Sequence, residues 1–219
     1  MRLYLASNRT RDSHAHLLRM AGPGARVGVI ANAVDDLPMA SRQAYARHVY
    51  DPIAEFRDQG LEAYDLDLRA YFRRPEALLA ELSRTRMVWA VGGNAFLLRR
   101  AMRQSGFDAI APGLVWAQQL IYGGWSAGAC VAAPSLRGLE LMDDPAVLAE
   151  GYQPDPVWEG LGLIDAAIVP HFRSEHAEAG AAARTASWMA ANRVPHRTLR
   201  DGDVLIQDGE TLELHVGRT

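Results

Sequence analysis

Near-continuous apolar runs alternate with segments of helical periodicity along the first two thirds of the chain. A run that is apolar at nearly every position is typical of a parallel strand that is covered on both faces. Strands are predicted at residues 2–6, 26–31, 61–66, 87–91 and 121–125, and helices at 12–20, 39–59, 75–84, 95–105 and 109–120. This alternation predicts an α/β fold with a doubly wound, mostly parallel sheet and helices on both faces.

The last third of the chain has a different pattern. A strand is predicted at 164–169, a helix at 175–192, and short extra strands at 197–199, 204–207 and 211–216. The least regular part, 141–159, carries several acidic residues and prolines, and it is a candidate wall for a binding site. No repeat, low-complexity tract or long linker divides the sequence, so a single domain over residues 1–219 is expected.

The most informative stretch is Gly-Trp-Ser-Ala-Gly at 124–128, between a predicted strand and an Ala-rich helix. It matches the G-x-S-x-G pattern, in which a tight turn exposes a serine hydroxyl above the edge of the sheet. The N–H groups at the start of the following helix would then face the place where an oxyanion forms. Ser126 is therefore a candidate nucleophile, although the same pattern also fits a serine that only caps a helix.

Two other predicted strands end in residues that fit the same chemistry. In doubly wound sheets, ligands gather beyond the carboxyl ends of the strands. His171 follows one strand and is a candidate general base, favoured over His176, which falls inside the following predicted helix. Gly92 and Gly93 follow another strand, and their N–H groups, with that of Ala127, are candidates for an oxyanion hole. A carboxylate would be needed to orient the imidazole.

Composition narrows the range of functions. The hydrophobic fraction of 49% and the net charge of −3 indicate neither a nucleic-acid partner nor a membrane surface. The single cysteine, Cys130, excludes an internal disulfide and a Cys-based zinc site, and it is expected to be a small buried residue. The sequence shows no two-His metal spacing and no dinucleotide fingerprint, so no metal and no cofactor are expected. Without a signal-peptide or membrane-span pattern, a soluble cytoplasmic protein is expected.

Three motifs in this order resemble the dipeptidase E (aspartyl dipeptidase) family, to which cyanophycinases are more distantly similar. They are Val-Gly-Gly-Asn-Ala-Phe at 91–96, Gly-Trp-Ser-Ala-Gly-Ala at 124–129 and Pro-His-Phe at 170–172, and the opening at 3–8 and the segment 160–163 are also similar. The resemblance implies a serine peptidase on a class I glutamine-amidotransferase-like fold. It also implies cleavage of short peptides with N-terminal aspartate, without a metal.

The resemblance also implies roles for particular residues. Ser126 would be the nucleophile and His171 the base, with Gly92, Gly93 and Ala127 forming the oxyanion region.

The sequence departs from the family pattern at two places. The family's acid lies in an Asn-Asp-Met-Pro segment, and the corresponding stretch here is Glu-Leu-Met-Asp-Asp-Pro at 140–145. Asp144 is favoured as the acid because it precedes a proline in a loop, with Asp143 and Glu140 as alternatives. The family's aspartate-binding arginine is not reproduced in its usual Thr-Arg segment. Arg184 lies at nearly the right distance from the histidine, and Arg173 lies beside it.

The leading hypothesis is a serine dipeptidase whose partner is a short peptide, with no nucleic acid or membrane. An α/β-hydrolase-type esterase is the alternative enzyme, since it uses the chain order Ser…Asp…His. The chain is short for that class and lacks a His-Gly-Gly-Gly-type oxyanion loop. A third reading is a non-catalytic protein of the same fold that binds a small ligand. The sequence leaves open whether the chain is a monomer or a homo-oligomer.

Overall fold

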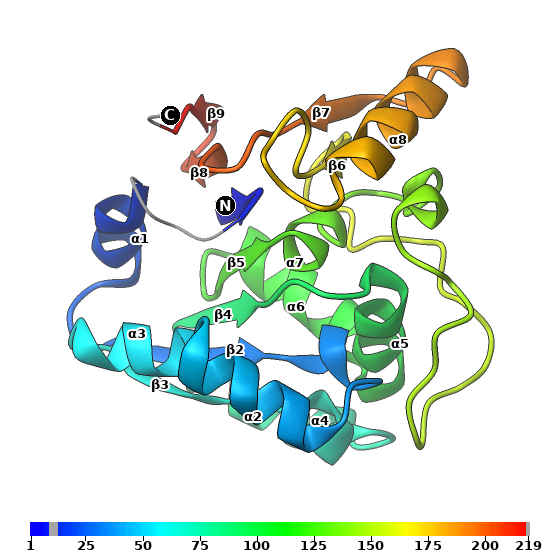
Figure 1. Cartoon of the computed structure of the whole chain (residues 1–219). Helices are drawn as coiled ribbons and strands as arrows, with labels where there is room; N and C mark the ends of the chain where they lie inside the picture. Colours follow the sequence, from blue (N-terminus) through cyan, green and yellow to red (C-terminus); the bar gives the residue numbers. More distant parts are fainter. Residues whose placement is uncertain (9–12, 218–219) are drawn as a thin grey trace.

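The computed structural model describes residues 1–8 and 13–217 and is built around a seven-stranded sheet (Figure 1). The strand order is β3-β2-β4-β5-β1-β8-β9. The first five of these strands are mutually parallel, and β8 and β9 are antiparallel additions at one edge. In that order the strands are Glu62–Asp65, Arg26–Ile30, Met87–Ala90, Ile121–Trp125, Arg2–Ala6, Val204–Asp208 and Leu212–His215.

Both faces of the sheet are buried. On β1, Leu3 and Leu5 belong to one hydrophobic cluster, whereas Tyr4 and Ala6 belong to another. Because successive side chains of a strand point to opposite faces, the two clusters are the two sides of one three-layer fold. The α/β fold class predicted from the alternating pattern is confirmed.

Helices supply the outer layers of both clusters. Side chains of α1 (His14–Ala21) and α3 (Pro52–Asp58) pack on the cluster that contains Tyr4. The other face is covered by helices α4 to α7, which are Pro75–Leu82, Ala95–Ser105, Phe107–Trp116 and Ala127–Cys130. The helix expected from residue 12 begins at His14, and residues 9–12 lie outside the described part of the chain.

The long helix expected over 39–59 is wrong in one respect, because the chain forms two helices there. Helix α2 is Met39–His48, and α3 begins at Pro52. Proline lacks an N–H group and its ring clashes with the carbonyl four residues earlier, so it is tolerated only in the first turn of a helix. Asp51 then caps α3, since its carboxylate accepts hydrogen bonds from the N–H groups of Ile53 and Ala54.

The histidine-bearing strand also differs from expectation. Strand β6 (Ala167–Val169) pairs in parallel with β7 (His196–Thr198) in a separate two-stranded sheet, rather than joining the main sheet. Helix α8 (Ala179–Ala191) is shorter than the helix expected at 175–192. Short 3-10 turns, η2 to η4, occur at Asn32–Val34, Leu68–Tyr71 and Leu139–Leu141. Among the described residues, no helix combines the length and the apolar character that crossing a membrane requires.

The antiparallel strand β8 has a consequence for the site. Ala6, the last residue of β1, pairs with Val204, the first residue of β8. Residues that precede β8 therefore lie at the same edge of the sheet as residues that follow the parallel strands. Asp201, shortly before β8, reaches that edge.

Candidate active site

Ser126 lies between β5 and the short helix α7 in a strained backbone conformation. Its φ is 50° and its ψ is −118°, a combination that a non-glycine residue adopts only when its surroundings enforce it. Its N–H group contacts the carbonyl oxygens of Ala6 and Ser7 at 3.1 and 3.2 Å, which ties the turn to the end of β1. This strand–turn–helix geometry is that of a nucleophile elbow.

The flanking glycines permit close packing of this turn. A Cβ at Gly128 would come within 2.1 Å of the carbonyl oxygen of Ala90, and one at Gly124 would come within 2.8 Å of the carbonyl carbon of Gly128. Neither glycine has a positive φ, whereas Ser126 between them does. The pattern Gly-x-Ser-x-Gly therefore reflects the contact of the elbow with β4 as well as the tightness of the turn.

His171 brings an imidazole to this serine. It follows β6 with a φ of 57°, and only 1% of its surface is exposed. Its Nε2 lies 3.2 Å from Oγ of Ser126, and its Nδ1 lies 2.7 Å from Oδ1 of Asp201. One ring nitrogen can therefore exchange a proton with the serine while the other donates to a carboxylate, which is the arrangement of a Ser–His–acid triad.

Asp201 is held in its ionised form by its neighbours. Burial raises the pKa of this carboxyl, but hydrogen bonds from His171, Ser7 and Asn8, with the charge of His171, bring its pKa below the ordinary value. The N–H group of Asp201 also donates to Oγ of Ser174 at 2.8 Å. An ionised carboxylate at this position fixes the tautomer of His171 and stabilises the imidazolium.

The acid expected at Asp144 does not reach the histidine, and this expectation is corrected by the geometry. Oδ1 of Asp144 accepts the N–H of Ala146 in an exposed part of the loop. Of the two alternatives, Glu140 accepts the N–H of Gly138, and Asp143 accepts the N–H of Ala95. Within the described part of the chain, the carboxylate that hydrogen-bonds Nδ1 is that of Asp201, which the sequence analysis did not consider.

Ser7 contacts Ser126, His171 and Asp201. Nothing in the sequence indicated this role. It is fully buried at the end of β1. Its hydroxyl accepts the N–H of His171 at 2.8 Å and donates to Oδ1 of Asp201 at 2.9 Å, and its carbonyl oxygen accepts the N–H of Ser126. Ser7 thus links Ser126, His171 and Asp201 to one another.

The loop after β4 carries the two glycines expected near an oxyanion. Gly93 has a φ of +136°, and a Cβ there would come within 2.5 Å of the carbonyl oxygen of Ala33. A Cβ at Gly92 would come within 2.6 Å of the Trp125 ring. None of the backbone hydrogen bonds found between elements and loops of the described residues uses the N–H groups of Gly92, Gly93 or Ala127, so these groups stay candidates for the oxyanion hole.

The irregular segment after η4 is fixed to the start and middle of α5. Asn94 caps α5 through Oδ1 and donates from Nδ2 to the carbonyl of Asp144. Arg100, almost fully buried on α5, donates to the carbonyl oxygens of Pro145, Val147 and Pro154. The segment, drawn in yellow-green, runs along the outside of α5 (Figure 1), and these bonds hold it in one conformation.

Two further carboxyl groups, those of Asp143 and Glu178, lie near His171. Burial raises the pKa of Asp143 to about 7, and the charge of Glu178 acts in the same direction, whereas the Ala95 N–H and His171 lower it. Oε2 of Glu178 lies 3.8 Å from Nε2 of His171. With Asp201, these groups give the surroundings of the histidine an acidic character.

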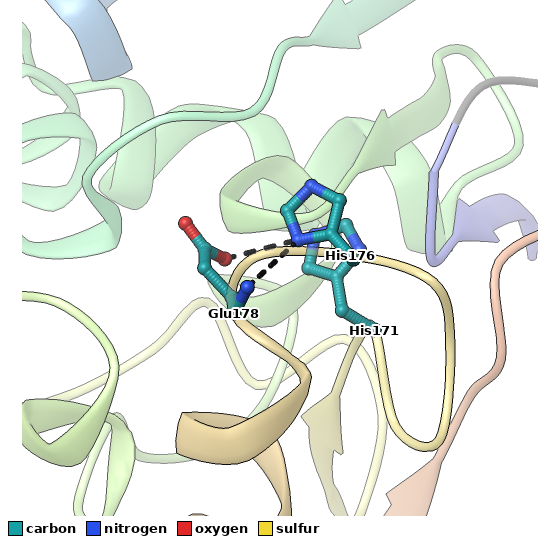
Figure 2. Close-up of side chains that lie close together, drawn as sticks. All are labelled: His171, His176 and Glu178. Atoms are coloured by element: carbon teal, nitrogen blue, oxygen red, sulfur yellow. Dashed lines mark hydrogen bonds and ion pairs between the residues drawn. The ribbon is translucent and has the colours of Figure 1, made fainter.

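His176 lies beside His171 rather than within a helix. It was expected inside the following helix, but α8 begins at Ala179, and His176 lies in the preceding turn. The two imidazole rings are stacked, with centroids 3.7 Å apart and planes 8° apart (Figure 2). Nδ1 of His176 accepts the N–H of Glu178 at 3.2 Å. His171, His176 and Glu178 form a cluster of potential metal ligands that the sequence analysis missed.

The arginines expected to bind substrate lie at the surface. Arg184 is exposed on α8 and extends along the helix toward Gly180. Arg173, two residues beyond His171, is exposed with a φ of 53° and lies over the ring of Phe172. Cys130 is buried, as expected, and its thiol contacts the carbonyl of Ile168.

A serine on a strained elbow, a histidine in contact with it and a carboxylate behind the histidine define the class of α/β proteins with a nucleophilic serine site. The model of peptidase family S51 matches residues 31–215, and this chain belongs to that family. The resemblance to the dipeptidase E family is thereby confirmed.

Individual relatives agree with this assignment. Peptidase E of Streptomyces coelicolor is 30% identical over 96% of this chain and 82% of its own length. An uncharacterized peptidase of Pasteurella multocida is 29% identical over 62% of this chain, and the match spans 63% of that protein. A crystal structure of a peptidase E candidate from Listeria monocytogenes superimposes with a TM-score of 0.73 at 18% identity, covering 98% of both chains, which shows a common fold.

Proposed function

We propose that this protein is a serine peptidase that hydrolyses short peptides, and that it acts as a dipeptidase with a preference for N-terminal aspartate. The observation that carries the proposal is the contact chain from Ser126 Oγ through His171 to the Asp201 carboxylate. Membership of a peptidase family supports the reaction class. The name of the Streptomyces coelicolor relative, Peptidase E, supports the narrower activity.

The first half of the reaction would use the geometry as follows. Nε2 of His171 takes the proton of the Ser126 hydroxyl while Oγ attacks the carbonyl carbon of the scissile peptide bond. The oxyanion of the tetrahedral intermediate accepts hydrogen bonds from the Ala127 N–H and from the loop of Gly92 and Gly93. His171 then gives its proton to the leaving amine, and an acyl-enzyme remains on Ser126.

In the second half, water enters and His171 takes a proton from it. The resulting hydroxide attacks the acyl carbon, the bond to Oγ breaks, and Ser126 recovers its proton from His171. The Asp201 carboxylate stabilises the imidazolium in both halves. Because α7 has only four residues, the oxyanion is held by individual N–H groups rather than by a long helix dipole.

The surroundings of the triad support a small substrate with a free amino terminus. Only 7% of the surface of Ser126 is exposed, so access to the hydroxyl is narrow. The carboxylate of Glu178, 3.8 Å from Nε2 of His171, favours a cationic group there, such as a free α-ammonium. The side chain of an N-terminal aspartate would need a cation, and Arg184 is the candidate, with Arg173 as the alternative.

The two other hypotheses fit less well. In an α/β-hydrolase the acid precedes the histidine in the chain, whereas here the order of the contacting residues is Ser126, His171, Asp201. A protein that only binds ligands has no need of a strained serine in contact with an oriented imidazole. Both facts favour the peptidase.

The proposal is tested with a dipeptide panel of Asp-Leu, Glu-Leu, Asn-Leu and Ala-Leu. We expect Asp-Leu to be cleaved fastest and Arg184→Ala to reduce that preference through KM, with Arg197→Ala on β7 as a control that leaves it unchanged. If Arg173→Ala has this effect instead, Arg173 is the specificity residue. Equal cleavage of all four dipeptides would reject the aspartate preference, and faster hydrolysis of aryl esters than of any dipeptide would favour the esterase.

A further inference from the structure

Three side chains with metal-binding atoms converge beside the nucleophile. One ligand atom from each of His171, His176 and Glu178 lies within 4.8 Å of the other two (Figure 2). The distance from Nε2 of His171 to Oε2 of Glu178 is 3.8 Å. In a tetrahedral zinc site with bonds of about 2.0–2.1 Å, neighbouring ligand atoms are about 3.4 Å apart. The ligand atoms must therefore come closer together to enclose an ion.

We propose that His171, His176 and Glu178 form a Zn²⁺ site that switches the peptidase off. Two imidazoles and one carboxylate are a ligand set that zinc uses where it keeps a fourth position for water or another oxygen. Oγ of Ser126, 3.2 Å from Nε2 of His171, is near enough to share that position with water. The ion would be an inhibitor and takes no part in the hydrolysis.

The hydrogen bonds around the two histidines determine which nitrogen of each ring can bind a metal ion. Asp201 holds Nδ1 of His171, which leaves the lone pair of Nε2 for the ion, and a carboxylate behind a ligating histidine is a common outer-shell arrangement. The N–H of Glu178 donates to Nδ1 of His176, so in the neutral ring Nδ1 carries the lone pair and Nε2 carries the proton. His171 therefore has the tautomer that offers Nε2 to zinc, whereas His176 can offer Nδ1 once that nitrogen releases the N–H of Glu178.

One side chain must move for the ion to bind. The rings of His171 and His176 are nearly parallel, so their in-plane lone pairs do not meet at one point. His176 is partly exposed before α8, and a rotation about its side-chain torsions that gives up the hydrogen bond from the Glu178 N–H aims Nδ1 at an ion held in the plane of His171. His171 is buried and stays in place. His176 is therefore the mobile ligand.

The acidic surroundings add to the attraction for a dication. The carboxylates of Glu178 and Asp201 lie 3.8 Å and 2.7 Å from the ring nitrogens of His171. Once zinc occupies Nε2 of His171, that nitrogen cannot accept the proton of Ser126. The inhibition, though not the binding, rests on the proposed serine mechanism.

The binding test uses the full chain, purified with a chelator and then dialysed free of it. Isothermal titration with ZnCl₂ should give one site, and the absorption spectrum of the Co²⁺ form should show the d–d bands of a tetrahedral site. We expect His176→Ala and Glu178→Gln each to weaken zinc binding by about 10-fold or more. His16→Gln is the matched control, because His16 also lies beside a second histidine, His215, away from the triad.

Inhibition is measured on the same variants. Zinc should inhibit the wild type at the concentrations at which it binds, a chelator should restore activity, and His176→Ala should need about 10-fold more zinc. Equal zinc affinity in the wild type and both ligand variants, or loss of binding in His16→Gln, would overturn the site. If zinc binds as expected but no peptide is cleaved by the metal-free protein, the site stands and the proposed function fails.

Discussion

Nδ1 of His171 lies 2.7 Å from Oδ1 of Asp201, a residue 30 positions further along the chain. The contact exists because β8 runs antiparallel to β1, so that the turn before β8 lies at the edge where the parallel strands end. The same carboxylate accepts a hydrogen bond from the buried hydroxyl of Ser7. Ser7, directly after the first strand β1, thus binds Asp201, which lies shortly before β8, the second-last strand.

Substitution of each candidate acid by asparagine distinguishes Asp201 from Asp144, which the sequence favoured. We expect Asp201→Asn to lower kcat by about 10⁴-fold, because the amide selects the wrong tautomer of His171. Asp144→Asn, in the exposed part of the loop, should change kcat less than about 3-fold. Steady-state kinetics on the best dipeptide of the panel measures both. A large loss in Asp144→Asn with a small one in Asp201→Asn would reverse the assignment.

Ser7→Ala tests the residue that joins the three members of the triad. The variant loses the hydroxyl that accepts the His171 N–H and donates to Asp201, and leaves a buried N–H without a partner. We expect a loss of about 1–3 kcal/mol in the free energy of unfolding. Catalysis should also suffer, with kcat falling by about 10-fold or more while KM changes little.

The control is Ser187→Ala on α8, whose hydroxyl bonds a carbonyl of its own helix at the surface. It should leave both the stability and kcat unchanged. An unaltered kcat in Ser7→Ala would show that the triad keeps its geometry without this residue.

Gly128→Ala tests the packing of the elbow. The added methyl group would lie 2.1 Å from the carbonyl oxygen of Ala90, so β4 and α7 must move apart. We expect the urea midpoint to fall by the equivalent of about 3 kcal/mol or more, or folding to fail. Gly113→Ala, in α6 with no atom within 4 Å of the new methyl group, should instead stabilise by about 0.5–1 kcal/mol. Similar behaviour of the two variants would contradict the packing argument.

The raised pKa of Asp143 predicts that the free energy of unfolding depends on pH. Its pKa of about 7 in the folded protein lies above the ordinary value of 3.8, so the folded state binds the proton more tightly than the unfolded state. The stability that this proton contributes is complete below about pH 4 and is lost as the pH rises to about 7.

The variant Asp143→Asn keeps an acceptor for the Ala95 N–H and removes the titration. Its free energy of unfolding, relative to the wild type, should therefore rise between pH 4 and pH 8. We expect a rise of about 1–2 kcal/mol, below the roughly 4 kcal/mol of three pKa units, since solvent and nearby groups relax. A difference that stays constant with pH would show that Asp143 titrates normally in the folded protein.

The sequence predicted the framework of the fold, and it singled out two of the three residues of the proposed triad, because these depend on local signals. Apolar runs marked β1, β2, β4 and β5, and the glycines around Ser126 marked the elbow. The break at Pro52 was also a local signal, and the prediction of one long helix ignored it. His171 was found from its place after an apolar run, although that strand belongs to the small second sheet.

The acid could not be found in this way. Asp201 approaches His171 only through the antiparallel pairing of β8 with β1, a contact between distant segments that no local pattern encodes. The stacking of His176 on His171 could not be found from local patterns either. It depends on α8 beginning only at Ala179, so that His176 lies outside the helix. Ser7 looked like the end of a strand, and its three contacts come from three separate parts of the chain.

The most direct test of the central claim is to locate the nucleophile. The wild type is treated with a fluorophosphonate while hydrolysis of Asp-Leu is followed, and the labelled peptide is identified by mass spectrometry. The account predicts one adduct, on Ser126, that forms in step with the loss of activity, with Ser126→Ala both unlabelled and at least about 10³-fold less active. Undiminished hydrolysis by Ser126→Ala, or inactivation with the label on another residue, would contradict it.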